Sequence, residues 1–143
     1  LKKFNKFNLE DSLIILDHCK RHEDHLMKYQ EADIALDTFP YTGVTTSFEA
    51  LWMNVPVLTM KGFNANSRCG ESINLNANME FFIAKNKEEY IEKAIYISRN
   101  LEKLDHYRDK LFHEILSSSL FDTNKFADEF LNKLDYIFNQ HKN

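Results

Sequence analysis

One short loop of this sequence has the residue types of a phosphate-binding site. Gly43-Val44-Thr45-Thr46 combines a glycine, which allows the backbone to approach a ligand closely, with two hydroxyl groups that can donate to phosphate oxygens. The loop follows an expected strand and precedes an expected helix, whose free backbone N–H groups and dipole would both favour an anion. We interpret it as a candidate diphosphate site. The alternative is an ordinary loop in which Thr45 or Thr46 caps the helix.

Two other side chains could complete a nucleotide site around this loop. Glu49 lies three residues beyond Thr46, one turn into the expected helix, where its carboxylate could accept hydrogen bonds from a ribose diol. A capping box between Glu49 and Thr46 is the alternative. His25 stands at the start of an earlier expected helix, where its imidazole could lie flat on a base ring. The alternative for His25 is a solvated surface histidine.

Three histidines at short spacing raise the question of a metal site. His18, His22 and His25 follow one another at intervals of four and three residues. A structural zinc site usually has four ligands, and no fourth candidate lies nearby in the sequence. We therefore predict no metal site.

Other polar residues near the expected strands are weaker candidates. Asp33 and Asp37 bracket a strand, and paired acids could perform general acid–base catalysis. However, an aspartate before Thr and Pro at a strand end is commonly a turn former, which is the interpretation we prefer for Asp37. Ser67-Arg68 could contact an anion or a sugar, with an exposed structural arginine as the equal alternative.

The elements that would position these residues alternate between strands and helices. Short apolar runs predict strands at residues 13–16, 34–36, 55–60 and 79–84. Helical spacing and N-terminal signals predict helices at about residues 22–32, 45–52, 64–78 and 86–97. This alternation implies an α/β fold with a doubly wound parallel sheet and right-handed crossovers. Ligands of such sheets bind beyond the carboxyl ends of the strands.

The pattern becomes purely helical from Leu101 onward, with Asp122 or Thr123 capping the last helix. We therefore divide the chain into a sheet-containing lobe at residues 1–100 and a helical extension at residues 101–143. We expect these C-terminal helices to pack on the same lobe.

Composition narrows the class of protein. The 143 residues are 43% hydrophobic and 28% charged, as expected for one globular domain. A net charge of −4 with dispersed basic residues argues against nucleic acid as a partner. Cys19 and Cys69 are widely spaced, which favours free thiols and a cytoplasmic location. The sequence has no apolar run long enough for a membrane span. Because the chain opens at Leu1, we expect it to be part of a longer protein.

Two neighbouring blocks of the sequence are DIALDTFPYTGVTT at residues 33–46 and EALWMNVPV at residues 49–57. Together they resemble the catalytic region of O-GlcNAc transferase and SPINDLY-type glycosyltransferases. Glu23-Asp24-His25 precedes these blocks, and SRCGES at residues 67–72 follows them. SSLFD at residues 118–122 also matches, so the resemblance covers most of residues 12 to 138.

The resemblance implies a fold and a chemistry. That family has two Rossmann-like lobes facing across a cleft (a GT-B fold), usually after tetratricopeptide repeats. It transfers a sugar from a UDP-sugar to protein Ser or Thr, or to Asn in a related bacterial branch. We therefore expect residues 1–100 to be an incomplete C-terminal, nucleotide-sugar-binding lobe of a bacterial, repeat-linked homologue. The sugar would be GlcNAc or a hexose, and the acceptor protein would bind through parts that precede this chain.

The resemblance also assigns roles by position. His25 would stack on the uracil, and Val44, Thr45 and Thr46 beside Gly43 would bind the diphosphate. Glu49 would hold the ribose, and Lys28 falls where a basic residue approaches the base. His22 falls where the family often has lysine, and is a weaker candidate. Neither a cofactor nor an obligatory metal is expected.

Two positions depart from the family pattern. Thr42 and Asn54 replace Asn and Gly, and Asn54 can still adopt the left-handed conformation that a glycine would have there. The first strand and helix of the lobe and the whole opposite lobe are also missing, so we expect no transfer by this chain alone. The alternatives are a GT-B glycosyltransferase acting on cell-surface polysaccharide and a non-catalytic nucleotide-binding or interaction module.

Overall fold

The computed structural model describes residues 2–141, and its centre is a three-stranded parallel sheet. The strands are β1 (Ala35–Leu36), β2 (Val57–Met60) and β3 (Ile83–Ala84), in the spatial order β1-β2-β3. Ala35 pairs with Val57, and Thr59 pairs with Ile83. The predicted parallel arrangement is confirmed, and each of these strands lies within its predicted range.

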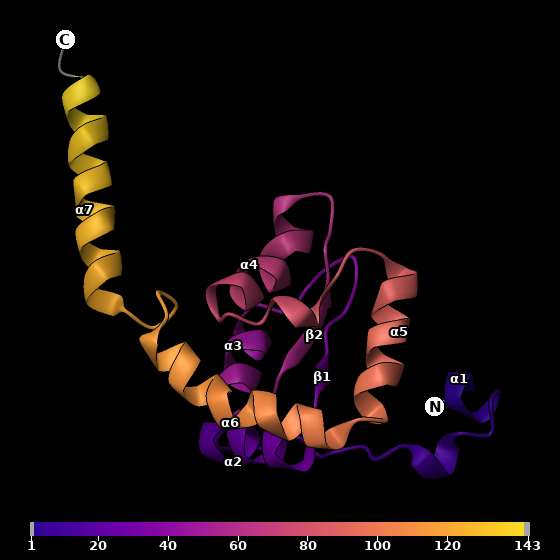
Figure 1. Ribbon diagram of the computed structural model, residues 1–143. Helices are drawn as coiled ribbons and strands as arrows, with labels where there is room; N and C mark the ends of the chain where they lie inside the picture. The colour runs from indigo at the N-terminus through magenta and orange to yellow at the C-terminus, as the bar shows by residue number, and fades with distance from the viewer. Residues whose placement is uncertain (1, 142–143) are drawn as a thin grey trace.

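Helices connect and cover the strands. The α-helices are α1 (Lys2–Asn5), α2 (His22–Met27), α3 (Thr45–Trp52), α4 (Cys69–Asn76), α5 (Lys87–Ser98), α6 (Leu101–Ser117) and α7 (Thr123–Gln140). The short 3-10 helices are η1 (Glu10–Ser12), η2 (Lys28–Glu31), η3 (Ala65–Arg68) and η4 (Glu80–Phe82). Figure 1 shows α3 and α4 on one side of the sheet and α5 on the other. This is the predicted α/β architecture with helices on both faces.

The strand predicted at residues 13–16 is wrong. This segment has no regular secondary structure, and Ile14 and Ile15 are 79% and 66% exposed. A strand needs a neighbour that satisfies its backbone groups and covers its side chains, and a short apolar run cannot supply one. Within residues 2–141 the sheet ends at β1, whose Leu36 is itself exposed.

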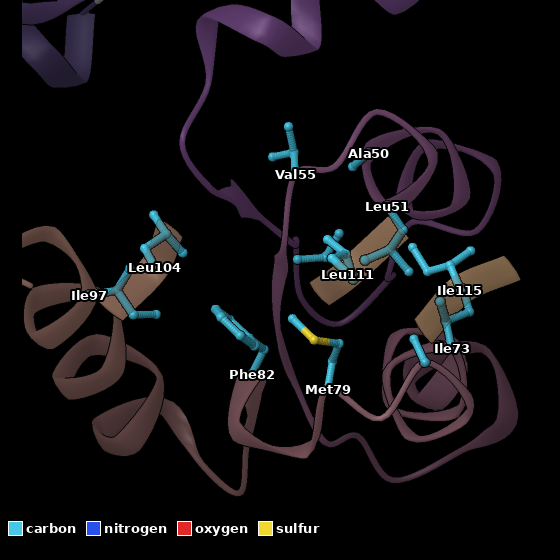
Figure 2. Close-up of a cluster of buried hydrophobic side chains, with 12 residues drawn as sticks. Ala50, Leu51, Val55, Ile73, Met79, Phe82, Ile97, Leu104, Leu111 and Ile115 are labelled. Carbon is cyan, nitrogen blue, oxygen red and sulfur yellow. The ribbon is translucent and has the colours of Figure 1, made fainter. Parts of the chain in front are cut away.

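The hydrophobic core lies between the sheet and α3, α4, α5 and α6. Leu51 from α3, Ile73 from α4 and Ile97 from α5 each point into it. Figure 2 shows Leu111 and Ile115 of α6 beside Leu51. It shows Leu104, also of α6, beside Ile97. The helical extension therefore contributes buried side chains to the core that holds the sheet.

The last helix, α7, lies apart from the hydrophobic core. Asp122 caps it by accepting a hydrogen bond from the Lys125 backbone N–H, as predicted. None of its residues is buried, and it extends away from the sheet in Figure 1. The division of the chain at residue 100 stays a prediction. No helix among the described residues is both long enough and apolar enough to cross a membrane.

Candidate functional site

Asp37, directly after β1, holds the loop that leads to α3. Its Oδ1 accepts hydrogen bonds from the backbone N–H of Thr38 at 2.9 Å and of Gly43 at 2.7 Å. Its Oδ2 accepts from the Thr59 hydroxyl at 2.7 Å, which ties the loop to β2. The turn-forming interpretation of Asp37 is confirmed. Asp33 lies elsewhere, with its Oδ1 3.5 Å from Arg108 Nη1.

Two glycines allow the close packing around Asp37. A Cβ atom at Gly43 would lie 2.4 Å from Thr46 Oγ1 and 3.0 Å from Ser47 Oγ. A Cβ atom at Gly70 would lie 2.3 Å from Thr59 Oγ1 and 2.6 Å from Asp37 Oδ2. Neither glycine has a positive φ. Both glycines therefore leave room for these side chains, and neither serves a left-handed backbone.

The phosphate-site loop ends where α3 begins, at Val44. Valine has no polar side chain, so α3 has no side-chain cap, and the alternative in which Thr45 or Thr46 caps the helix is not formed. Val44, Thr45 and Thr46 are all exposed. The first turn of α3 thus presents its backbone N–H groups without a capping side chain, which is the arrangement that favours an anion.

Glu49, one turn into α3, meets three side chains from α2 and η2. Its Oε2 lies 3.3 Å from His25 Nε2 and 3.3 Å from the Tyr29 hydroxyl. Its Oε1 lies 3.8 Å from His22 Nε2. The Glu49 side chain is only 15% exposed. The alternative capping box with Thr46 is not formed, and Glu49 instead joins the two helical segments.

Tyr29 is a member of this cluster that the sequence analysis missed as a site residue. Its hydroxyl lies 3.3 Å from both the Thr46 carbonyl oxygen and Glu49 Oε2. Burial, and then the Glu49 charge and hydrogen bond, raise the pKa of Tyr29 to about 12. The phenol therefore stays protonated and donates at neutral pH. One signal was available: Tyr29 lies four residues after His25, so both belong to one helical face.

Tyr29 lines two hollows. The first, of about 180 Å³, is lined by Asp37, Gly43 and Thr46 along with Tyr29. The second, of about 460 Å³, is lined by His25, Lys28 and Tyr29 together with residues 16–19. Lys28 Nζ donates to the Asp17 carbonyl at the edge of the second hollow. Two of the predicted diphosphate residues, Gly43 and Thr46, thus line one hollow, and the predicted base residues His25 and Lys28 line the other, whereas Val44 and Thr45 line neither.

Ser67 and Arg68 have structural partners. The Ser67 hydroxyl and the Asn64 side chain form a reciprocal capping box at η3. Arg68 binds Glu71 through Nε at 2.6 Å and Nη2 at 3.2 Å, and Lys61 Nζ lies 3.2 Å from the same carboxylate. These contacts, the Arg68 hydrogen bond foremost, hold the pKa of Glu71 below its usual value. These contacts favour a structural role for Ser67 and Arg68 over the alternative of binding an anion or a sugar.

The histidines do not form a metal cluster. Among the residues that the structure describes, no three His, Cys, Asp or Glu side chains are arranged to hold a metal ion. His22 and His25 instead lie beside Glu49, with their ring centroids 6.2 Å apart. Cys19 and Cys69 are both free thiols.

Comparison with known sequences gives a consistent result. The model of glycosyl transferase family 41 matches residues 1–130. A probable UDP-N-acetylglucosamine–peptide N-acetylglucosaminyltransferase SPINDLY from Solanum lycopersicum is 39% identical over 115 residues, which are 80% of this chain and 12% of that protein. A UDP-N-acetylglucosamine–peptide N-acetylglucosaminyltransferase from Caenorhabditis elegans is 27% identical over 134 residues, 94% of this chain and 12% of that protein.

A solved structure shares the fold. A mutant O-GlcNAc transferase from Thermobaculum terrenum superposes with a TM-score of 0.77 at 37% sequence identity. The match covers 83% of this chain and 23% of that one. The chain therefore corresponds to a limited part of each of these longer proteins.

Proposed function

The chain belongs to glycosyl transferase family 41, and from that membership we propose that it is the UDP-sugar-binding part of an enzyme that glycosylates protein side chains. It spans only 12% of the length of the curated relatives given above. The activity therefore belongs to a longer protein, and the acceptor binds to parts outside this chain. The donor carries GlcNAc, the sugar that the relatives' names give, or a hexose.

One observation carries the donor assignment: Tyr29 lines both the hollow at Gly43 and Thr46 and the hollow at His25 and Lys28, and Glu49 contacts Tyr29 and His25. A nucleoside diphosphate has the same order of groups, with the ribose between the base and the phosphates. In the proposed complex, the base lies on His25, the ribose reaches Glu49, and the diphosphate lies at the first turn of α3.

The chemistry follows from that placement. An acceptor side chain attacks the anomeric carbon and loses its proton to solvent, the bond from that carbon to the diphosphate oxygen breaks, and UDP leaves with the electron pair. The N–H groups at the start of α3 and the hydroxyls of Thr45 and Thr46 stabilise the charge that develops on the diphosphate. This proposal involves no cofactor and no obligatory metal. We also propose that the longer protein is cytoplasmic and carries tetratricopeptide repeats.

The test is nucleotide selectivity. Calorimetry on the complete protein should give tighter binding of UDP than of ADP or GDP. Replacing His25 by Ala should reduce that preference, because the base contact is lost. Replacing Thr46 by Ala should weaken the binding of all three nucleotides, because all three carry the diphosphate. Equal binding of the three nucleotides by the unaltered protein, or no binding, would refute the assignment.

A further inference from the structure

We propose that Tyr29 is a positioning residue: its hydroxyl fixes Glu49 so that the carboxylate faces the ribose of the donor. This inference rests on the proposed function, because it assumes that Glu49 binds the ribose. It adds a residue outside the phosphate loop on which the precision of the donor site depends.

The hydroxyl touches both the side chain and the backbone of α3. Its oxygen lies 3.3 Å from Glu49 Oε2 and 3.3 Å from the carbonyl oxygen of Thr46. A phenol has one proton to donate, so the two acceptors share it. Tyr29 itself belongs to η2, which is separate in sequence from α3. The Tyr29 hydroxyl therefore connects η2 to α3 beside the Glu49 carboxylate.

The two carboxylate oxygens of Glu49 are in different surroundings. Oε2 is close to His25 and Tyr29, both at 3.3 Å, whereas Oε1 is 3.8 Å from His22. If the base lies on His25, that imidazole is turned to the ligand, and Tyr29 remains as the protein's donor to Oε2. Oε1 is then the oxygen directed to the ribose. A carboxylate without the Tyr29 bond would be free to rotate away from this orientation.

The ring and the hydroxyl of Tyr29 have separable roles. The ring packs against the hydrophobic core and makes an edge contact with His25, with centroids 5.7 Å apart and planes at 80°. Phenylalanine keeps the ring and removes the hydroxyl alone. Tyr29→Phe therefore isolates the positioning role, and Tyr136→Phe on the exposed surface of α7 makes the same chemical change far from the sheet.

The experiment compares two ligands that differ only in the ribose diol. Calorimetry with UDP and with 2′,3′-dideoxyuridine diphosphate is performed on the complete protein and on Tyr29→Phe, Glu49→Ala and Tyr136→Phe. Tyr29→Phe should lower the affinity for UDP about tenfold, since one hydrogen bond to a charged group is lost. It should leave the dideoxy ligand unchanged, because that ligand has no diol for Glu49 to bind. Tyr136→Phe should change neither affinity, and the calorimetric stoichiometry reports the folded fraction of each variant.

The outcomes separate the inference from the proposed function. If Glu49→Ala weakens UDP selectively but Tyr29→Phe does not, the positioning role is wrong and the ribose assignment stands. If Tyr29→Phe weakens both ligands equally, the hydroxyl does not act through Glu49, and the inference is also wrong. If Glu49→Ala has no effect on UDP, the ribose assignment itself fails. In a protein that carries both Tyr29→Phe and Glu49→Ala, UDP should bind no more weakly than it binds to the Glu49→Ala variant.

Discussion

Glu49 Oε2 on α3 lies 3.3 Å from His25 Nε2 on α2, although the two residues are 24 positions apart in the sequence. The expected ribose contact and the expected base contact are therefore neighbours in space. The Glu49 side chain is mostly buried, whereas that of His25 is half exposed. A ligand can therefore reach His25 from solvent more easily than it can reach Glu49.

The loop before α3 should depend on Asp37. Replacing Asp37 by Ala removes the acceptor of the Gly43 and Thr38 N–H groups and of the Thr59 hydroxyl. We expect a loss of about 2 kcal/mol in the free energy of unfolding, measured by urea denaturation, together with weaker UDP binding. Asp33→Ala is the matched control, since its ion pair is exposed and should be worth under about 1 kcal/mol. Equal losses for both variants would contradict this role of Asp37.

Gly70 should resist substitution even though it lies in a helix. Alanine in place of glycine in a helix usually stabilises by about 0.5–1 kcal/mol. At Gly70 the new Cβ would lie 2.3 Å from Thr59 Oγ1, so we expect a net loss of roughly 1–3 kcal/mol instead. Ser72→Ala, at an exposed position of the same helix, should change stability by less than about 0.5 kcal/mol. A stabilised Gly70→Ala variant would show that α4 does not pack on Asp37 and Thr59 as described.

Asn54 ends α3 in a left-handed conformation, with φ of 63°, and its buried Oδ1 has no hydrogen-bond partner among the described residues. Asn54→Gly should raise the free energy of unfolding by about 0.5 kcal/mol, because glycine adopts this conformation without steric cost. Asn54→Ala should lower it by about 1 kcal/mol, because alanine does not. Thermal or urea denaturation gives the order of stability of the parent protein and the two variants. An alanine variant as stable as the glycine variant would contradict this explanation.

Glu71 should contribute to the pH dependence of stability. Its ion pairs with Arg68 and Lys61 lower its pKa from the ordinary 4.5, so its contribution is present above pH 4.5 and is lost as the pH falls through the lowered value. Glu71→Gln should therefore be less stable than the parent at pH 7, and the difference should shrink in acid. The check is urea denaturation across pH 3 to 7, with the exposed Glu102→Gln as control. A difference that stays constant over this range would rule out the ion pairs as its source.

Local signals predicted the parts of the fold whose causes are local. Apolar runs located β1, β2 and β3, Asn54 was expected to replace a left-handed glycine, and Asp122 or Thr123 was expected to cap α7. The glycine replacement and the cap depend on residues close in sequence, whereas β1, β2 and β3 formed because each run has a partner strand. The strand prediction at residues 13–16 failed because pairing depends on a neighbouring strand, which the run itself does not encode.

The candidate site was only partly predictable for the same reason. The spacing of Gly43, Thr46 and Glu49 could be interpreted from the sequence because these residues belong to one loop and the helix that follows it. The contact of Tyr29 with Glu49 joins segments that are 20 residues apart, and spacing does not report it. The alternative of a threonine cap is not formed, because Val44 occupies the N-cap position, one residue before Thr45.

The most direct test of the donor site is a crystal structure of the complete protein with UDP bound. The account predicts the diphosphate at the backbone N–H groups of residues 44–46, the ribose diol on Glu49 and the uracil against His25. UDP bound elsewhere, or bound here with its base at Gly43 and its phosphates at His25, would contradict it.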